Sequence, residues 1–154
     1  MATRTDPGRE TAAPPRTLRQ LGYGVAAGVN AALLYLINGA PGWQAVPFLT
    51  DDVEAVLGIV NTSLLAGLVV NLLWSLADPE WWRALGQVVL SAIGLAATLQ
   101  ILDVFPFDFT GWAFDPTWLV RLVLVVAAFG TGISLLVQVV TLVRVAVTGG
   151  RSSG

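Results

Sequence analysis

The sequence predicts an all-α integral membrane protein, a bundle of four transmembrane helices with a disordered N-terminal tail. Of its 154 residues, 55% are apolar and only 12% are charged, about half the charged fraction of soluble domains. The charges leave four uncharged stretches near or above the roughly 20 residues that cross the hydrocarbon core, namely 20–50, 55–77, 84–102 and 122–143. An ordinary water-soluble domain is excluded. A transmembrane barrel is also excluded, because its alternating ten-residue segments are missing.

The N-terminal segment is polar and precedes the first long apolar run. Residues 1–17, MATRTDPGRETAAPPRT, are rich in Thr, Pro, Ala and charge, so we expect a disordered cytoplasmic tail. The first span is predicted over residues 18–40. A signal peptide has a short apolar region followed by a small-residue cleavage site, whereas this run is long and ends in Asn-Gly-Ala-Pro. We therefore expect an uncleaved first span.

The other three spans are predicted over residues 53–77, 82–104 and 117–147, and residues 148–154 are expected to form a flexible C-terminal tail. The connection Ala77-Asp78-Pro79-Glu80 is so short that the second and third spans must form an antiparallel hairpin. Together, residues 18–147 make up one membrane domain.

The arginines predict the orientation of the spans, because basic residues in short loops stay on the cytoplasmic side. The first and third connections contain no basic residue and several carboxylates. Both termini are therefore expected in the cytoplasm, in a bacterial cytoplasmic (inner) membrane. The tails and the second connection hold seven arginines: Arg4, Arg9, Arg16, Arg19, Arg83, Arg144 and Arg151.

Three amide side chains fall at one depth. Counting 1.5 Å per residue from each predicted midpoint places Asn71, Gln87 and Gln138 about 9 or 10 Å toward the cytoplasm. We expect an interior polar layer of cross-helix hydrogen bonds that fixes the register of the helices. A site for a polar substrate or an ion is the alternative.

Small residues predict which faces of the helices pack closely. The first span offers Gly24 and Gly28, one turn apart, and this face is expected to face the bundle. Asn30 points about 120° away from it. We expect Asn30 either to form a hydrogen bond within the bundle from another side of the helix or to mark a contact in an oligomer.

One arginine, Arg121, is predicted on the outer side of the membrane, whereas the other seven are predicted on the cytoplasmic side. Arg121 lies near the outer end of the fourth span, and Asp103 lies at a matching height on the third. We expect an ion pair at the outer interface, which lowers the cost of placing the guanidinium there. Asp115 is a competing partner, and binding of a substrate is the alternative role.

The third connection is unusually aromatic. Residues 105–114, FPFDFTGWAF, hold five aromatic side chains in ten positions, too many for a loop surrounded by water. We expect this segment to lie in the outer headgroup layer or to cap the bundle, with a partner-binding surface as the alternative.

The composition also limits the chemistry. Cysteine and histidine are both absent, which excludes thiol and imidazole catalysis, haem ligation and the usual zinc sites. We expect no cofactor and no catalytic role. Divalent-ion binding by the outer aspartates is a weaker alternative. No basic stripe is present, so nucleic acid is not an expected partner.

Two segments carry a resemblance. VNAALLYLINGAPGW and VFPFDF resemble segments of small uncharacterised four-helix membrane proteins of actinobacterial type, which implies the same fold and no known activity. The first span, LRQLGYGVAAGVNAALLYLIN, also resembles the opening of GtrA-like proteins, which are linked to polyprenyl-phosphate sugar flipping. The likeness stops after Asn71, where the chain continues LLWSLADPE, so no site residue is transferred.

These observations favour an accessory or scaffold subunit that associates through small-residue helix faces, with itself or with a larger membrane complex. The alternative is a subunit of an oligomeric small transporter, channel or lipid-carrier system. The lipid bilayer is the expected partner in both cases.

Overall fold

The computed structural model describes residues 15–77 and 79–149, and within these ranges the protein is all-helical. Four long helices are present, α1 (Arg16–Asn38), α2 (Val53–Leu76), α3 (Glu80–Val104) and α4 (Thr117–Gly149), together with the short 3-10 helix η1 (Trp43–Ala45). Every end of the long helices lies within two residues of its predicted position. The predicted tails lie largely outside the described residues, except that α1 already begins at Arg16 and α4 continues to Gly149.

Each long helix is apolar and long enough to cross a membrane, which confirms the prediction of four helices of this kind. The shortest, α1, has 23 residues, or about 35 Å at 1.5 Å per residue, against a hydrocarbon core of about 30 Å. Prolines precede three of the helices, Pro15 before α1, Pro79 before α3 and Pro116 before α4. Proline suits a helix start because the first N–H groups have no partner within the helix.

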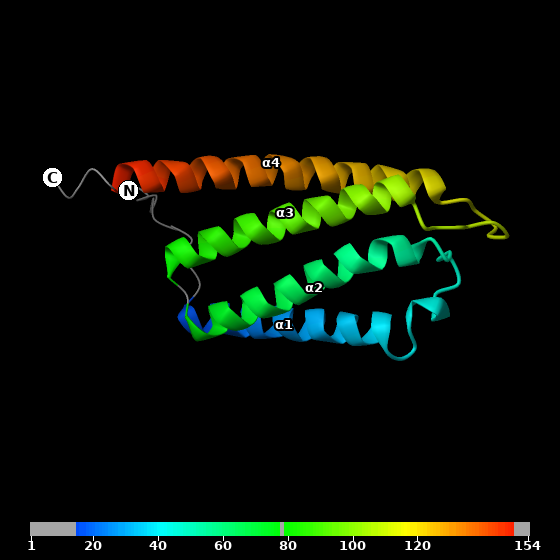
Figure 1. The fold of residues 1–154 in the computed structure, drawn as a ribbon, viewed down its shortest axis with the longest axis horizontal. Helices are drawn as coiled ribbons and strands as arrows, with labels where there is room; N and C mark the ends of the chain where they lie inside the picture. Colours follow the sequence, from blue (N-terminus) through cyan, green and yellow to red (C-terminus); the bar gives the residue numbers. More distant parts are fainter. Residues whose placement is uncertain (1–14, 78, 150–154) are drawn as a thin grey trace, which may run out of the picture.

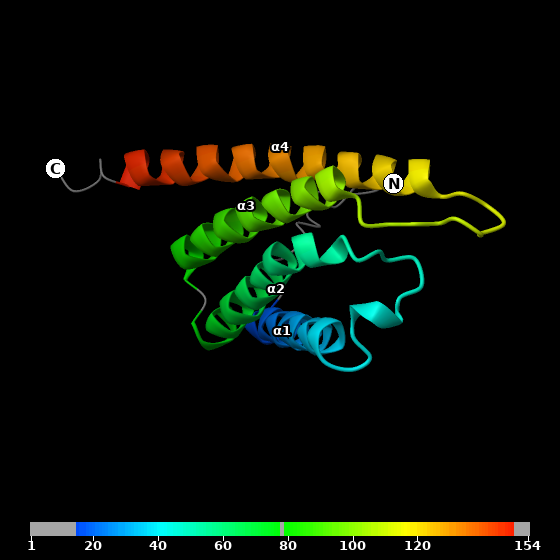
Figure 2. The ribbon, with the colours of Figure 1, turned by 45° about the vertical axis from the view of Figure 1, so that its right-hand side comes forward.

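The helices lie side by side in chain order (Figures 1 and 2). Among the described residues α1 contacts α2, α2 contacts α3, and α3 contacts α4, whereas α1 and α4 do not meet. The bundle is therefore open. Such an arrangement is permitted in lipid, because no hydrophobic force drives helices together there. Most large apolar side chains are accordingly exposed, and few residues are buried.

The charges separate along the helix axes. The start of α1, the turn between α2 and α3, and the end of α4 lie at one end of the molecule (Figure 1). This end, hereafter the arginine end, carries Arg16, Arg19, Arg83 and Arg144. The two longer connections lie at the opposite end, hereafter the loop end, where most of the carboxylates and Arg121 are found.

The two connections at the loop end pair with each other. Leu49 and Phe107 form an isolated antiparallel bridge. The N–H of Thr50 donates to the carbonyl of Pro106 at 3.2 Å, and the N–H of Asp108 donates to the carbonyl of Phe48 at 2.9 Å. These bonds join the first and third connections into one cap over the loop end.

Candidate functional site

The contact between α1 and α2 is a polar seam. The amide of Asn30 in α1 lies against Gly67 in α2, where a Cβ would meet the Asn30 Oδ1 at 2.9 Å. Asn30 Nδ2 donates to the carbonyl of Ala26 at 2.8 Å. On the facing helix, Asn71 Nδ2 donates to the carbonyl of Gly67 at 2.7 Å. Gly67 thus leaves room for the Asn30 amide between the helices.

The seam continues toward both ends of the helices. Near the loop end, Asn38 and Asn61 exchange two amide hydrogen bonds of 2.8 Å each. Near the arginine end, Gln20 Nε2 donates to the carbonyl of Ser75 at 3.4 Å. Polar side chains therefore cross from α1 to α2 at both ends and pack in the middle.

The seam shows that the expected packing face of α1 was wrong. Gly24 and Gly28 have nothing within 4 Å of the position of a Cβ, so they face away from α2. The packed face instead carries Ala27, which is 3% exposed, and Asn30. The physical reason is that Gly67 on α2 leaves room for the Asn30 amide, which keeps its hydrogen bond within α1.

The three amides of the predicted polar layer lie in two places. Asn71 is buried and bonds within α2, one turn from the Gly67 that faces Asn30. Gln138 in α4 accepts a hydrogen bond from Ser91 Oγ at 3.1 Å and donates to Ser134 Oγ at 2.9 Å. No hydrogen bond among the described residues joins two of the three amides. The expected layer of hydrogen bonds among the three amides is therefore not formed, because Asn71 bonds Gly67 within α2 and Gln138 bonds Ser91 and Ser134.

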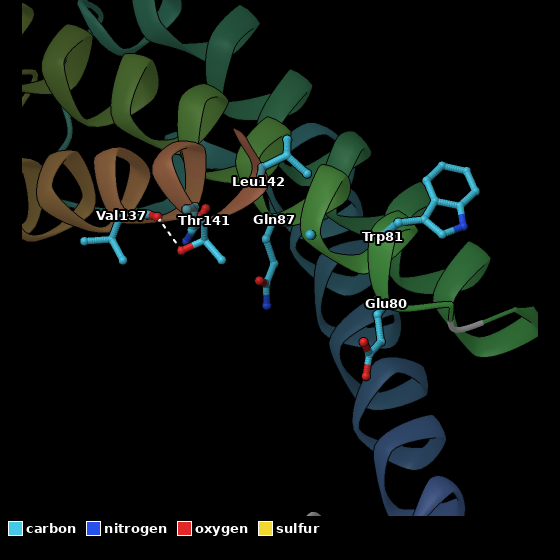
Figure 3. Close-up of a pocket in the computed structure, with 8 residues that line it drawn as sticks. Glu80, Trp81, Gln87, Val137, Thr141 and Leu142 are labelled. Carbon is cyan, nitrogen blue, oxygen red and sulfur yellow. Dashed lines mark hydrogen bonds between the residues drawn. The ribbon is translucent and has the colours of Figure 1, made fainter. Parts of the chain in front are cut away.

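Gln87 and Gln138 instead line a shared cleft between α3 and α4 at the arginine end (Figure 3). Its volume is about 650 Å³, within the range of small-molecule sites. Thr141 donates its hydroxyl to the carbonyl of Val137 at 2.8 Å. The lining residues are Glu80, Trp81, Ala84, Gln87, Val137, Gln138, Thr141 and Leu142.

Two polar groups of this α3–α4 cleft have no partner in the described part of the chain, the Glu80 carboxylate and the Gln87 amide. They lie seven residues apart, two helical turns, and extend to the same side of α3, whereas Trp81 points away from them (Figure 3). The sequence prediction identified Gln87 but missed Glu80. The spacing of residues 80, 84 and 87 could have identified Glu80, because residues separated by four and three positions lie on the same face of a helix.

The buried contact between α2 and α3 depends on Trp74. Its indole is 6% exposed and lies 5.3 Å from the ring of Tyr23. Gly86 in α3 allows close approach, because a Cβ there would lie 2.7 Å from Cζ2 of Trp74. This packing holds α3 against α2, and it therefore positions one wall of the α3–α4 cleft.

The cap at the loop end is aromatic, as the third connection predicts. Phe48 of the first connection stacks on Phe109 of the third at 5.8 Å, and Trp112 meets Phe109 edge-on at 5.6 Å. Pro106 is fully buried beneath them. The cap ties the two connections together through ring packing and the backbone bonds described above.

Arg121 is held by an aromatic ring. Its guanidinium carbon lies 4.1 Å from the centre of the Phe105 ring, a cation–π geometry. Phe105 has φ of 45° at the end of α3, and this left-handed turn positions its ring. No ion pair between Asp103 and Arg121 is present among the described residues. The competing partner Asp115 accepts hydrogen bonds from the N–H and hydroxyl of Thr117 instead.

Two carboxyl groups at the loop end have a lowered pKa. The backbone N–H of Thr110, and secondly its hydroxyl, lower the pKa of Asp108. The hydroxyl of Thr117, and secondly its N–H, lower the pKa of Asp115. Both hold local turns in place. No group of three acidic side chains placed for a metal is found in the described ranges.

Comparison with known proteins gives no relative from which a role could be transferred: no protein-family model, no curated protein and no solved structure matches the chain.

Proposed function

We propose that the protein is an accessory or scaffold subunit of a bacterial cytoplasmic membrane, with both termini in the cytoplasm. The open row of helices carries this proposal. A closed four-helix bundle pairs its first and last helices, whereas in the described part of this chain α1 and α4 do not meet. Each of them is left with one face for association with a second copy or another membrane protein.

The outward face of α1 supports the same role. Gly24 and Gly28 are exposed and have open space where a side chain would lie. In lipid, faces of small residues allow close helix approach and favour association. The proposal includes no catalytic activity, because the chain has neither cysteine nor histidine.

Association is tested by replacing both glycines with leucine, in Gly24→Leu together with Gly28→Leu. The control is Gly58→Leu in α2, where a Cβ likewise meets nothing within 4 Å. Cross-linking in native membranes and affinity capture in mild detergent should detect a complex for the wild type and the control. The double variant should lose it. A wild type that is monomeric and without companions in both measurements would exclude a scaffold role.

Orientation is tested separately with single cysteines, since the chain has none. Thr110→Cys at the loop end should react with a membrane-impermeant maleimide added outside spheroplasts. Ala77→Cys at the arginine end should react only after lysis. The reverse pattern would invert the proposed topology.

The α3–α4 cleft favours a second candidate, a subunit of an oligomeric small transporter, channel or lipid-carrier system. Its volume of about 650 Å³ and its amide groups suit a small polar solute. Flux across liposomes that contain the protein, compared with Gln87→Leu, tests this role. Equal flux with and without protein would exclude it for each solute measured.

A further inference from the structure

The α3–α4 cleft opens at the level where a bilayer changes from headgroups to hydrocarbon. Glu80 is the first residue of α3, so in the proposed membrane placement its carboxylate lies among the headgroups. Gln87 lies seven residues further along, about 10 Å deeper at 1.5 Å per residue. The headgroup layer is roughly 7 Å thick on each side. Gln87 therefore lies at the edge of the hydrocarbon, just below the ester groups of phospholipids.

Gln87 needs a hydrogen-bonding partner at this depth. Its side chain is exposed and has no protein partner among the described residues, and an unpaired amide in hydrocarbon is costly. The neighbouring polar groups are already used, since Gln138 bonds both Ser91 and Ser134. Thr141 likewise donates its hydroxyl to Val137 within α4.

We propose that the α3–α4 cleft binds a phospholipid whose headgroup carries a primary ammonium, with the ammonium on Glu80 and an acyl ester carbonyl accepting from the Gln87 amide. An ammonium offers three N–H donors to the carboxylate. A quaternary ammonium offers none, and a glycerol headgroup carries no ammonium for the carboxylate. The acyl chain lies along the apolar wall formed by Val137 and Leu142.

The geometry of the two groups supports a single ligand. Glu80 and Gln87 extend to the same side of α3 (Figure 3), two helical turns apart, so one ligand that lies along the helix can reach both. The inference rests on the proposed membrane placement. It is independent of the proposed association, because Gly24 and Gly28 lie on α1, which over residues 15–77 and 79–149 makes no contact with α3 or α4.

The test measures which lipids stay bound. The full-length protein is exchanged into mixed micelles with equal amounts of phosphatidylethanolamine, phosphatidylcholine and phosphatidylglycerol of identical acyl chains. Retained lipids are then counted by native mass spectrometry. We expect at least threefold enrichment of phosphatidylethanolamine over each of the other two lipids. Equal retention of the three lipids would overturn the proposal.

Two variants test the carboxylate and the amide of the site separately. Glu80→Gln should abolish the preference for phosphatidylethanolamine, and Gln87→Leu should lower retention of all three lipids. The controls Glu54→Gln at the loop end and Thr62→Val on an exposed face of α2 should behave as wild type. Thermal unfolding of each variant distinguishes loss of the site from loss of the fold. Wild-type retention in a folded Glu80→Gln and a folded Gln87→Leu would refute the assignment.

A third arm separates the lipid from its free headgroup. Glycerophosphoethanolamine carries the ammonium and the phosphate but no acyl ester. A hundredfold excess should displace little phosphatidylethanolamine, because Gln87 and the apolar wall contact only the lipid. Full displacement would show that the cleft recognises a soluble amine and would overturn the assignment to a lipid.

Discussion

The two outer helix pairs have the same apolar character but are joined in different ways. Between α1 and α2, Asn38 and Asn61 exchange two hydrogen bonds, and Asn30 packs directly on Gly67. Between α3 and α4, Ser91 donates a hydrogen bond to Gln138 across the contact, and the helices leave the α3–α4 cleft at the arginine end.

The difference shows what sets the tightness of helix pairing in this protein. Apolar surface does not distinguish lipid from a neighbouring helix, so pairing depends on close approach and on polar groups that meet. The pair of α1 and α2 has both at several levels. The pair of α3 and α4 has them mainly at Ser91 and at the cap, and it therefore has room for a ligand.

The largest expected effect comes from Gly67→Ala, which fills the seam. The new Cβ would meet Asn30 at 2.9 Å, so α1 and α2 must separate or Asn30 must give up its bond to Ala26. We expect a loss of about 1–3 kcal/mol in the free energy of unfolding, the usual cost of overpacking. SDS titration in mixed micelles measures it.

The matched control is Gly94→Ala in α3, where a Cβ meets nothing within 4 Å. Alanine favours a helix by up to about 1 kcal/mol relative to glycine, so the control should be neutral or stabilising. Equal changes for the two variants would contradict the assignment of the seam as the tighter contact.

The next effect concerns the amide pair of the seam. Asn38→Leu and Asn61→Leu should each destabilise the protein, and the double variant should lose less than the sum of the two. The coupling is expected near 1 kcal/mol, within the range for hydrogen bonds between membrane helices. A double-mutant cycle by SDS titration measures it. Purely additive losses would show that the pair contributes nothing beyond its separate side chains.

The helices themselves could be predicted from the sequence because a single physical requirement fixes them. An uncharged run of about 20 residues in lipid must satisfy its backbone internally and so forms a helix. The arginines and aspartates also mark the ends well, as the close agreement at Val53 and Val104 shows.

The partner faces could not be predicted in the same way. Gly24 and Gly28 satisfy a packing pattern, yet α1 turns Asn30 toward α2 because only the facing Gly67 makes room for the amide. The spacing of small residues along one helix does not show which residue faces them on the neighbouring helix. Likewise, Asp103 and Asp115 were the partners that the sequence suggested for Arg121. The left-handed turn at Phe105 instead places an aromatic ring against the guanidinium.

A smaller effect is expected at the contact between α3 and α4. Gln138→Leu removes the acceptor of Ser91 and the donor to Ser134. Its coupling to Ser91→Ala should stay below about 0.6 kcal/mol, the average for such bonds in membranes, since the neighbouring cleft admits other partners. The same double-mutant cycle measures it. A coupling larger than that of Asn38 with Asn61 would reverse the ranking of the two pairs.

The smallest effect tests the cap, which links the two pairs at the loop end. Asp108 and Asp115 have a pKa below the ordinary value of about 3.9. Their hydrogen bonds therefore stabilise the cap fully above that value, and this stabilisation is lost as the pH falls through the lowered pKa of the folded state. Titration of the carboxyl carbons by NMR in micelles measures both groups.

Two threonine variants distinguish the causes of the lowered pKa values. Thr117→Val removes the hydroxyl that contributes most to the lowered pKa of Asp115. Thr110→Val removes only the second contribution at Asp108, where the backbone N–H of residue 110 remains. The pKa of Asp115 should therefore rise more than that of Asp108. Equal rises in the two pKa values would show that the hydroxyls act alike at both turns. No rise at either carboxyl would show that the threonine hydroxyls do not lower these pKa values. The expected order follows from the geometry, because only the side-chain donor is lost while the turn at each carboxylate keeps its backbone bond.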